Sequence, residues 1–181
     1  LHCSTRRQRQ MCIRDRATSS TVTNNSTPTI TGTAEANSKV TLLNGAVVLG
    51  TTTADSEGNF SITLATELED GNYSLTAKTT DSAENTSSES SALSITIDAT
   101  APNAPSALAT SSTVTNNSTP TITGTAEANS TVTLLNGDIV VGTATADSEG
   151  LFSITTNTLE DGVYSLTAKT TDSAENTSSE S

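Results

Sequence analysis

The 181-residue chain contains 20 acidic residues against 8 lysines and arginines, a formal net charge of −12 at pH 7, and it has only two phenylalanines, two tyrosines and no tryptophan. Because this charge repels phosphate, it argues against nucleic-acid binding. No apolar run approaches the roughly 20 residues of a membrane-spanning helix, so we expect no direct membrane insertion by this chain.

Residues 1–16 differ from everything that follows. They contain five of the eight basic residues, both cysteines, and the only histidine and methionine. Their last six residues, MCIRDR, resemble the translation of a sequencing-library adapter. We therefore expect a non-native leader, the alternative being a basic anchor or a nucleic-acid tail. Residues 17–181 alone contain three lysines and 19 acidic residues, a charge of −16.

Beyond the leader the chain is a tandem repeat. The string ATSSTVTNNSTPTITGTAEANS at 17–38 recurs unchanged at 109–130, an offset of 92 residues. After one deletion near Glu67 the offset becomes 91. Self-similarity with a period of this size predicts two copies of one domain.

Within each copy, apolar residues alternate with polar ones in short runs rich in Thr, Val and Ile, which is the pattern of a strand with one buried face. In the first copy these residues are Ile30; Val40 and Leu42; Val47 and Leu49; Phe60, Ile62 and Leu64; Tyr73, Leu75 and Ala77; and Leu93, Ile95 and Ile97. Between them, Asn44-Gly45 suits a tight hairpin, and DSEG and LEDG suit type I turns. The pattern predicts an all-β fold of tandem antiparallel β-sandwiches with about seven strands each.

The alignment of the copies also predicts domain bounds. The first repeat spans 17–98, residues 99–108 are a proline-containing linker and the start of the next repeat, and the second repeat spans 109–181. The second copy has no counterpart of the last apolar run, so we expect it to lack its final strand. Each buried aliphatic side chain contributes about 1.5–3 kcal/mol, against a domain stability of about 5–15 kcal/mol. The second repeat alone is therefore expected to be marginal or unfolded.

A motif of the form L-x-D-G-x-Y-x-L begins at Leu68 in the first copy and at Leu159 in the second. It resembles the tyrosine corner of immunoglobulin-like sandwiches, in which a tyrosine near the start of a late strand bonds back to the preceding turn. The residues that we expect to have this structural role are Tyr73, Tyr164, Gly71 and Gly162.

The strings PTITGTAEANSTVTLLNG, LEDGVYSLTAKTTDSAEN and LSITIDATAPNAP resemble bacterial immunoglobulin-like repeats of large surface adhesins and biofilm-associated proteins. The resemblance covers essentially all of residues 17–181. It implies spacer repeats that project a distal binding domain for adhesion or biofilm formation, with neighbouring repeats as partners. It also implies a cell-surface or extracellular location and export by type I secretion. The family commonly has D-x-A-G-N where this chain has Glu84 in place of the glycine.

A second interpretation is an immunoglobulin-like accessory module that binds a glycan or a protein beside a secreted enzyme. Carbohydrate platforms usually expose aromatic side chains, whereas Phe60, Phe152, Tyr73 and Tyr164 fall at core-facing positions, which favours the spacer. No enzyme is predicted. Residues 17–181 contain no histidine or cysteine for a nucleophilic site and no glycine-rich phosphate loop.

Calcium at the junctions between repeats is the cofactor that the resemblance implies. Ca²⁺ takes six to eight oxygen ligands, and the chain beyond the leader has many carboxylates without competing thiolates or imidazoles. We expect ligands at Asp98, which ends the last strand, and at Asp81 in the loop after the Tyr73 strand, with Asp172 as its second-copy counterpart. The alternative is that these acids cap their own turns.

Overall fold

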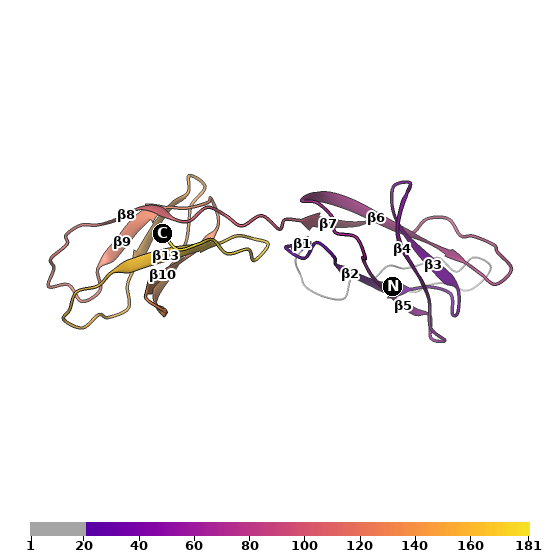
Figure 1. Ribbon diagram of the computed structural model, residues 1–181, viewed down its shortest axis with the longest axis horizontal. Coiled ribbons are helices and arrows are strands. Elements are labelled where there is room, and N and C mark those ends of the chain that lie inside the picture. The colour runs from indigo at the N-terminus through magenta and orange to yellow at the C-terminus, as the bar shows by residue number, and fades with distance from the viewer. Residues whose placement is uncertain (1–20) are drawn as a thin grey trace. The chain divides into compact units, whose positions relative to one another are not determined.

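The computed structural model describes residues 21–181, so the predicted leader at 1–16 lies outside the described residues. The chain divides into two compact units, of which the first ends at Ala99 and the second begins at Thr100. Every regular element described is a β-strand (Figure 1). The predicted tandem all-β fold is confirmed. No helix of the described part has the length and hydropathy needed to cross a bilayer.

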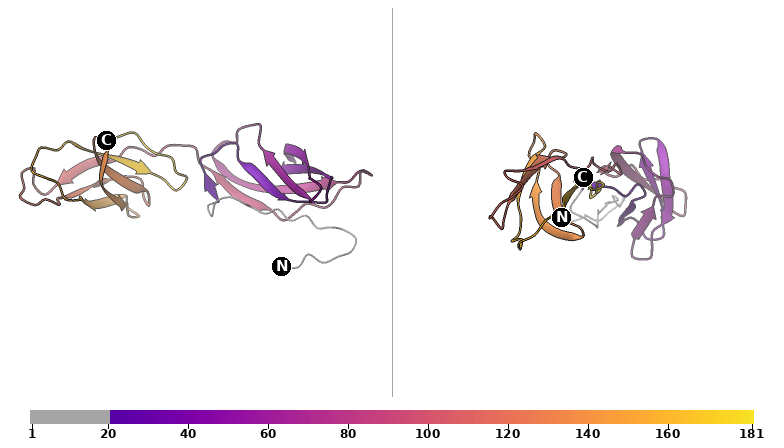
Figure 2. Two further views of the ribbon diagram at one scale, coloured as in Figure 1. Left: turned by 90° about the horizontal axis from the view of Figure 1, so that it is seen from below. Right: turned by 60° about the vertical axis from the view of Figure 1, so that its left-hand side comes forward.

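The first unit is a sandwich of two sheets, whose layers can be followed in Figures 1 and 2. One sheet has the strand order β1-β7-β6-β3-β4 and the other pairs β2 with β5. All pairs are antiparallel except β1 with β7. The strands are β1 Val22–Thr23, β2 Thr29–Thr33, β3 Lys39–Asn44, β4 Val47–Thr53, β5 Asn59–Thr63, β6 Gly71–Thr80 and β7 Leu93–Ile97.

The core of the first unit lies between the two sheets and is mainly aliphatic. It consists of the inward-facing members of the alternating runs, which are Ile30, Val40, Leu42, Ala54, Phe60, Ile62, Leu64, Leu75 and Ala77. Leu93 and Ile95 of β7 pack against this cluster, and Ile97 is 1% exposed. The period-two pattern therefore identified the buried face of β2, β3, β5 and β6. It was wrong for Val47 of β4, which is 61% exposed.

The second unit repeats this plan with six strands. Its sheets have the orders β11-β10-β13 and β12-β9-β8. The hairpins β3–β4 and β10–β11 have the same register, including a shift after Leu42 and after Leu134. The strands are β8 Ser106–Thr110, β9 Thr121–Thr125, β10 Thr131–Asn136, β11 Ile139–Thr145, β12 Leu151–Thr155 and β13 Leu166–Thr171. The predicted linker at 99–108 therefore overlaps β8, which pairs with β9.

The second unit differs from the first where a final strand is missing. The 181-residue sequence stops before any counterpart of β7, as the alignment predicts. Residues 71–74 of β6 pair with β7, whereas the equivalent residues 162–165 form no strand and β13 begins at Leu166. Leu75 is 0% exposed, but Leu166 is only partly buried against its core. In the first unit β7 therefore supplies both backbone pairing and burial.

Serine side chains cover the edge of β6 that faces away from β3. Ala77 and Thr79 donate their backbone N–H groups to the hydroxyls of Ser90 and Ser87, each at 3.0 Å. Both serines donate their own N–H groups to the carbonyls of the same two residues. The counterpart serines cover β13 in the same way. We call residues 86–90 and 177–181 the serine segments; they occupy backbone groups that would otherwise invite edge-to-edge association.

The backbone of the loop after β6 is strained at Glu84, and the equivalent loop of the second unit is strained at Glu175. Glu84 has a φ of 63° and Glu175 a φ of 70°, in the left-handed region that glycine tolerates best. Both positions correspond to the glycine of the D-x-A-G-N pattern.

We expect Glu84→Gly to stabilise the first unit by up to about 1 kcal/mol, because relief of this strain exceeds the added freedom of the unfolded chain. That corresponds to a rise in melting temperature of about 4–8 °C for a domain of this size. Thermal unfolding measures the change. The control is Glu84→Gln, which removes the charge but keeps the Cβ atom; an equal shift in both variants would contradict the explanation.

Candidate functional site

The DSAEN loop after β6 is closed by Asp81 itself. Its Oδ1 accepts the backbone N–H groups of Ala83 at 2.9 Å and of Asn85 at 2.8 Å, and its Oδ2 accepts the Asn85 side-chain amide at 2.9 Å. Asp172 accepts the same three bonds in the second-copy loop. Each of these two predicted calcium ligands therefore already receives three N–H donors from its own loop.

The DSEGN turn between β4 and β5 uses the same arrangement. Asp55 Oδ1 accepts the N–H groups of Glu57 at 2.9 Å and Asn59 at 2.8 Å. Gly58 has a φ of +87°, and a Cβ atom there would lie 2.5 Å from the carbonyl oxygen of Ala34. The turn therefore requires its glycine and is held by its aspartate. This agrees with the prediction of a type I turn at DSEG.

The hydrogen bonds in these loops change the acidity of two aspartates. The Asn85 side-chain amide, followed by the Asn85 backbone N–H, lowers the pKa of Asp81 below its ordinary value. The backbone N–H of Asn59 is the main cause of the lowered pKa of Asp55. Both carboxylates are therefore stabilised in their ionised forms by the folded loops.

These shifts predict a loss of stability in acid. Because the folded-state pKa is lowered, the contribution of each aspartate is complete above the unfolded pKa of about 3.9 and is lost as the pH falls through the lower folded value. We expect Asp81→Asn to destabilise the first unit at pH 7 and to have a much smaller effect near pH 2. Urea unfolding at the two pH values measures the difference. The exposed Glu67→Gln is the matched control, and an Asp81→Asn effect that is independent of pH would contradict the assignment.

Asp98 follows directly after β7. Its backbone N–H donates to the Thr23 carbonyl at 3.0 Å, and the N–H of Ala99 donates to Asp70 Oδ1 at 2.7 Å. Asp70 belongs to the LEDG turn that precedes β6, so two carboxylates from distant parts of the sequence lie at the same end of the first unit. The sequence reasoning did not select Asp70, although its place in the repeated turn was an available signal.

Within residues 21–181, no three Asp, Glu, His or Cys side chains gather closely enough to hold a metal ion. A Ca²⁺ ion needs six to eight oxygen atoms. Asp81 and Asp172 already accept N–H donors, and two carboxylates at the end of the first unit form only part of a ligand set. Calcium at Asp81, Asp98 and Asp172 stays a prediction.

The two tyrosines stabilise the turns that precede β6 and β13. Each hydroxyl donates a hydrogen bond to the backbone carbonyl four residues earlier, at 2.8 Å from Tyr73 and 2.9 Å from Tyr164. Gly71 opens β6 and pairs with β7, whereas Gly162 lies in a bend outside any strand. The corner is thus retained in the second unit even though its following residues have no partner strand.

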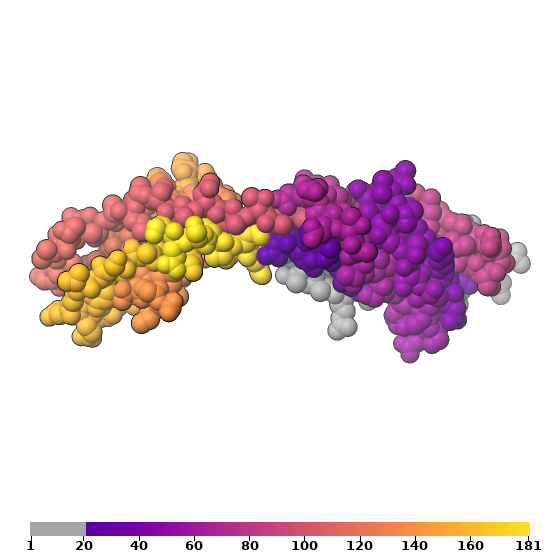
Figure 3. Space-filling model, viewed as in Figure 1, coloured from indigo at the N-terminus to yellow at the C-terminus, as the bar shows by residue number. Residues whose placement is uncertain are grey.

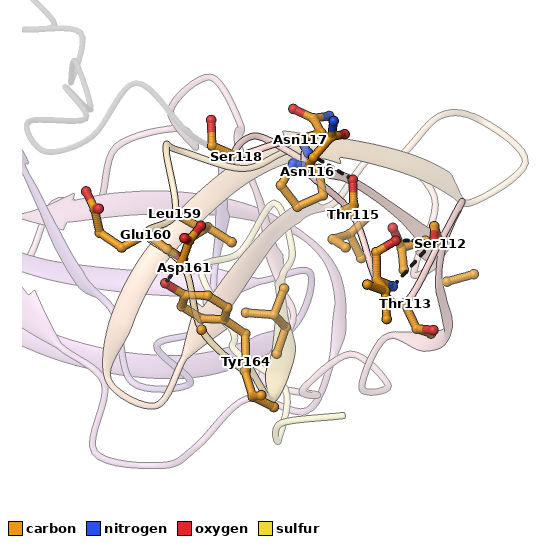
Figure 4. A pocket seen from close by; sticks show the side chains of 18 of the residues that line it. Ser112, Thr113, Thr115, Asn116, Asn117, Ser118, Leu159, Glu160, Asp161 and Tyr164 are labelled. Carbon is orange, nitrogen blue, oxygen red and sulfur yellow. Dashed lines mark hydrogen bonds between the residues drawn. The ribbon is translucent and has the colours of Figure 1, made fainter.

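The second unit contains an open groove of about 680 Å³ between the loop at 112–118 and the corner at 159–164 (Figure 4). Leu108, Ile122 and Leu166 provide apolar surface, while hydroxyl and amide side chains of the loop line the rest. In Figure 3 the two segments, coloured red and gold, are seen at one end of this unit. No sequence motif drew attention to this groove as a site.

A family model described as bacterial Ig-like domain matches residues 14–99 and 100–181. The chain belongs to the bacterial Ig-like domain family. The two matched ranges meet where the structure divides the chain. The predicted relation to bacterial immunoglobulin-like repeats is confirmed. No curated protein matches these Ig-like repeats.

Many solved structures have a likeness to the Ig-like repeats, and the three described here each have a TM-score below 0.5. The BSP domain of a biofilm-associated protein is 20% identical, with a TM-score of 0.36, over 94% of this chain and 28% of that chain. A tetra-tandem repeat from the extending region of a large adhesion protein is 25% identical, with a TM-score of 0.36, over 88% of this chain and 46% of that chain. Beta-glucuronidase 3 of Bacteroides uniformis is 15% identical, with a TM-score of 0.33, over 88% of this chain and 22% of that chain. The chain thus spans less than half of each.

Proposed function

We propose that the two Ig-like units are spacer repeats of a large bacterial surface adhesin, which hold a distal binding domain away from the cell for adhesion or biofilm formation. The main support is the internal duplication. One sandwich follows another of the same strand register along the chain, with only a short connection between them. A chain of such units gains about 35–40 Å per copy, the length of a strand of about eight residues with its end loops.

The surface chemistry supports this role. Outward-facing strand positions carry threonine hydroxyls that bond across the β2–β5 and β9–β12 pairs, between Thr29 and Thr63 at 2.8 Å and between Thr121 and Thr155 at 3.2 Å. The charge of −16 over residues 17–181 makes neighbouring units and chains repel one another. The serine segments cover a sheet edge in each unit. These features favour a soluble, extended array over self-association.

The position of the aromatic side chains favours a spacer over a carbohydrate-binding accessory module. Phe60 and Phe152 are buried, and Tyr73 and Tyr164 are half-buried and bonded to their turns. No aromatic platform is therefore exposed on the described residues. We infer a non-enzymatic protein at the bacterial surface or outside the cell, exported by type I secretion, whose partners within the chain are its neighbouring repeats.

The spacer proposal predicts how the length grows with copy number. Residues 17–108 form one whole period of the repeat. We expect arrays of two, four and six such periods to gain maximum dimension linearly, by about 35–40 Å per copy, in small-angle X-ray scattering. A maximum dimension that instead increases with copy number as the radius of a compact particle or of a random coil does would rule out a spacer.

We also propose that Ca²⁺ binds at the end of the first unit with Asp98 as a ligand, and that it stiffens the array. The support is the position of Asp98 directly after β7 and the nearby Asp70, whose carboxylate binds the next N–H group. We expect millimolar Ca²⁺ to raise the unfolding midpoint of the chain relative to chelator. The gain in the free energy of unfolding is about 2.7 kcal/mol at a hundredfold excess over Kd. Asp98→Asn should abolish this shift, whereas Glu67→Gln should retain it. Equal midpoints with Ca²⁺ and with chelator would end the proposal.

A further inference from the structure

The first and last strands described in the first unit, β1 and β7, are bonded directly to each other (Figure 1). They run parallel, with Val22 opposite Thr96 and Thr23 opposite Ile97. The backbone N–H groups of Thr96 and Asp98 donate to the carbonyls of Thr21 and Thr23, at 2.6 and 3.0 Å. The chain therefore enters and leaves this sandwich through two strands that hold each other.

The parallel direction of this pair decides how it responds to tension. A pull on the residues before β1 and on the residues after β7 draws the two strands in opposite directions along their shared axis. The hydrogen bonds of a parallel pair are evenly spaced along the strands, so they all resist this sliding at once. An antiparallel pair that is pulled apart from one end instead loses its bonds one after another.

β7 is held to the rest of the first unit on its other side. Its five residues pair with residues 71–75 of β6. The Thr96 hydroxyl donates to Asn72 Oδ1 at 2.6 Å, and the Ala99 N–H donates to Asp70 Oδ1 at 2.7 Å. Tension therefore passes from β1 to a strand that is fixed along its whole length, and β2 to β6 stay unloaded while the β1–β7 bonds last.

We propose that the β1–β7 pair is a mechanical clamp, which carries tension along the chain in shear and keeps the first unit folded until its bonds break together. The inference rests on the proposed spacer role, because a spacer between a cell and a distal binding domain is pulled from both ends. It adds a second property to reach, which is a length that persists under force.

The clamp separates resistance to force from stability at equilibrium. The small aliphatic core and the β6–β7 ladder contribute to the free energy of unfolding whether or not the chain is pulled. The bonds from Thr96 and Asp98 to β1 oppose only the sliding of the two end strands. Loss of one of these bonds should therefore weaken the first unit much more in one direction of pulling than in another.

Single-molecule force spectroscopy on the whole 181-residue chain tests the proposal. Cys3 and Cys12 are replaced by serine, so that two introduced cysteines are the only points of attachment. Ser20→Cys with Ala101→Cys pulls β1 against β7 in shear. Glu69→Cys with Ala101→Cys is the matched control on the same unit, because both positions lie next to the Gly71–Ile97 end of the antiparallel β6–β7 ladder and open it from there.

We expect the first unit to unfold in the shear geometry at a force at least about twofold higher, since the bonds of the parallel pair share the load that the control places on one pair at a time. Asp98→Pro removes the N–H group that binds the Thr23 carbonyl. It should lower the shear force and leave the control force unchanged. Asp98→Asn keeps this N–H group and should retain both forces when each is measured in chelator.

Three results would overturn the clamp. They are equal unfolding forces in the two geometries, an Asp98→Pro variant that lowers both forces in the same proportion, and an Asp98→Pro variant that lowers neither. A loss in both geometries would show only a general weakening of the sandwich. The growth of array length with copy number tests the spacer separately, because scattering measures reach in the absence of force.

Discussion

The pairing of β6 with β7 closes the sandwich of the first unit. β7 binds the first half of β6 on one side and β1 on the other, and its inward side chains cover the core. The first unit has this strand and the second unit, as given, does not, although their sequences are nearly identical. In the second unit the residues equivalent to the start of β6 lie outside the sheet, Leu166 is less buried than Leu75, and Val114 is exposed. In the first unit one five-residue strand joins β1 to β6.

The domain also shows how a chain with four aromatic residues holds a defined shape. Its cores are small and aliphatic, so hydrogen bonds within loops fix the geometry that larger cores obtain from packing. Asp55, Asp81 and Asp172 each close a turn with their carboxylates, and a tyrosine holds each corner. The same bonds use up carboxylate oxygens, so an acidic composition does not by itself supply metal ligands.

Much of the fold could be predicted from the sequence because period-two alternation reports burial directly in a two-layer sandwich. The alternating runs, the LEDG corners and the missing final strand all follow from residue types and from the internal alignment. The direction in which polar side chains bond does not follow from them. Capping of its own loop by Asp81 was the alternative that the sequence offered to a calcium ligand, and residue types alone do not decide between the two. Asp70, close to Ala99, was missed because their contact joins segments 29 residues apart.

The serine segments favour strand pairing within one copy over exchange of strands between near-identical neighbours. Strands β2 to β5 of the first copy have near-equal counterparts in the second, about 92 residues away. Ser87 reaches Thr79 across 8 residues and Ser90 reaches Ala77 across 13. Each doubling of the length of a closed loop costs about 0.6 kcal/mol. Pairing with the neighbouring copy, about 92 residues away, is therefore disfavoured by roughly 2 kcal/mol relative to these local bonds. Short-range hydroxyl bonds thus give each copy a kinetic preference for its own edge, and a long array of similar domains can fold one domain at a time.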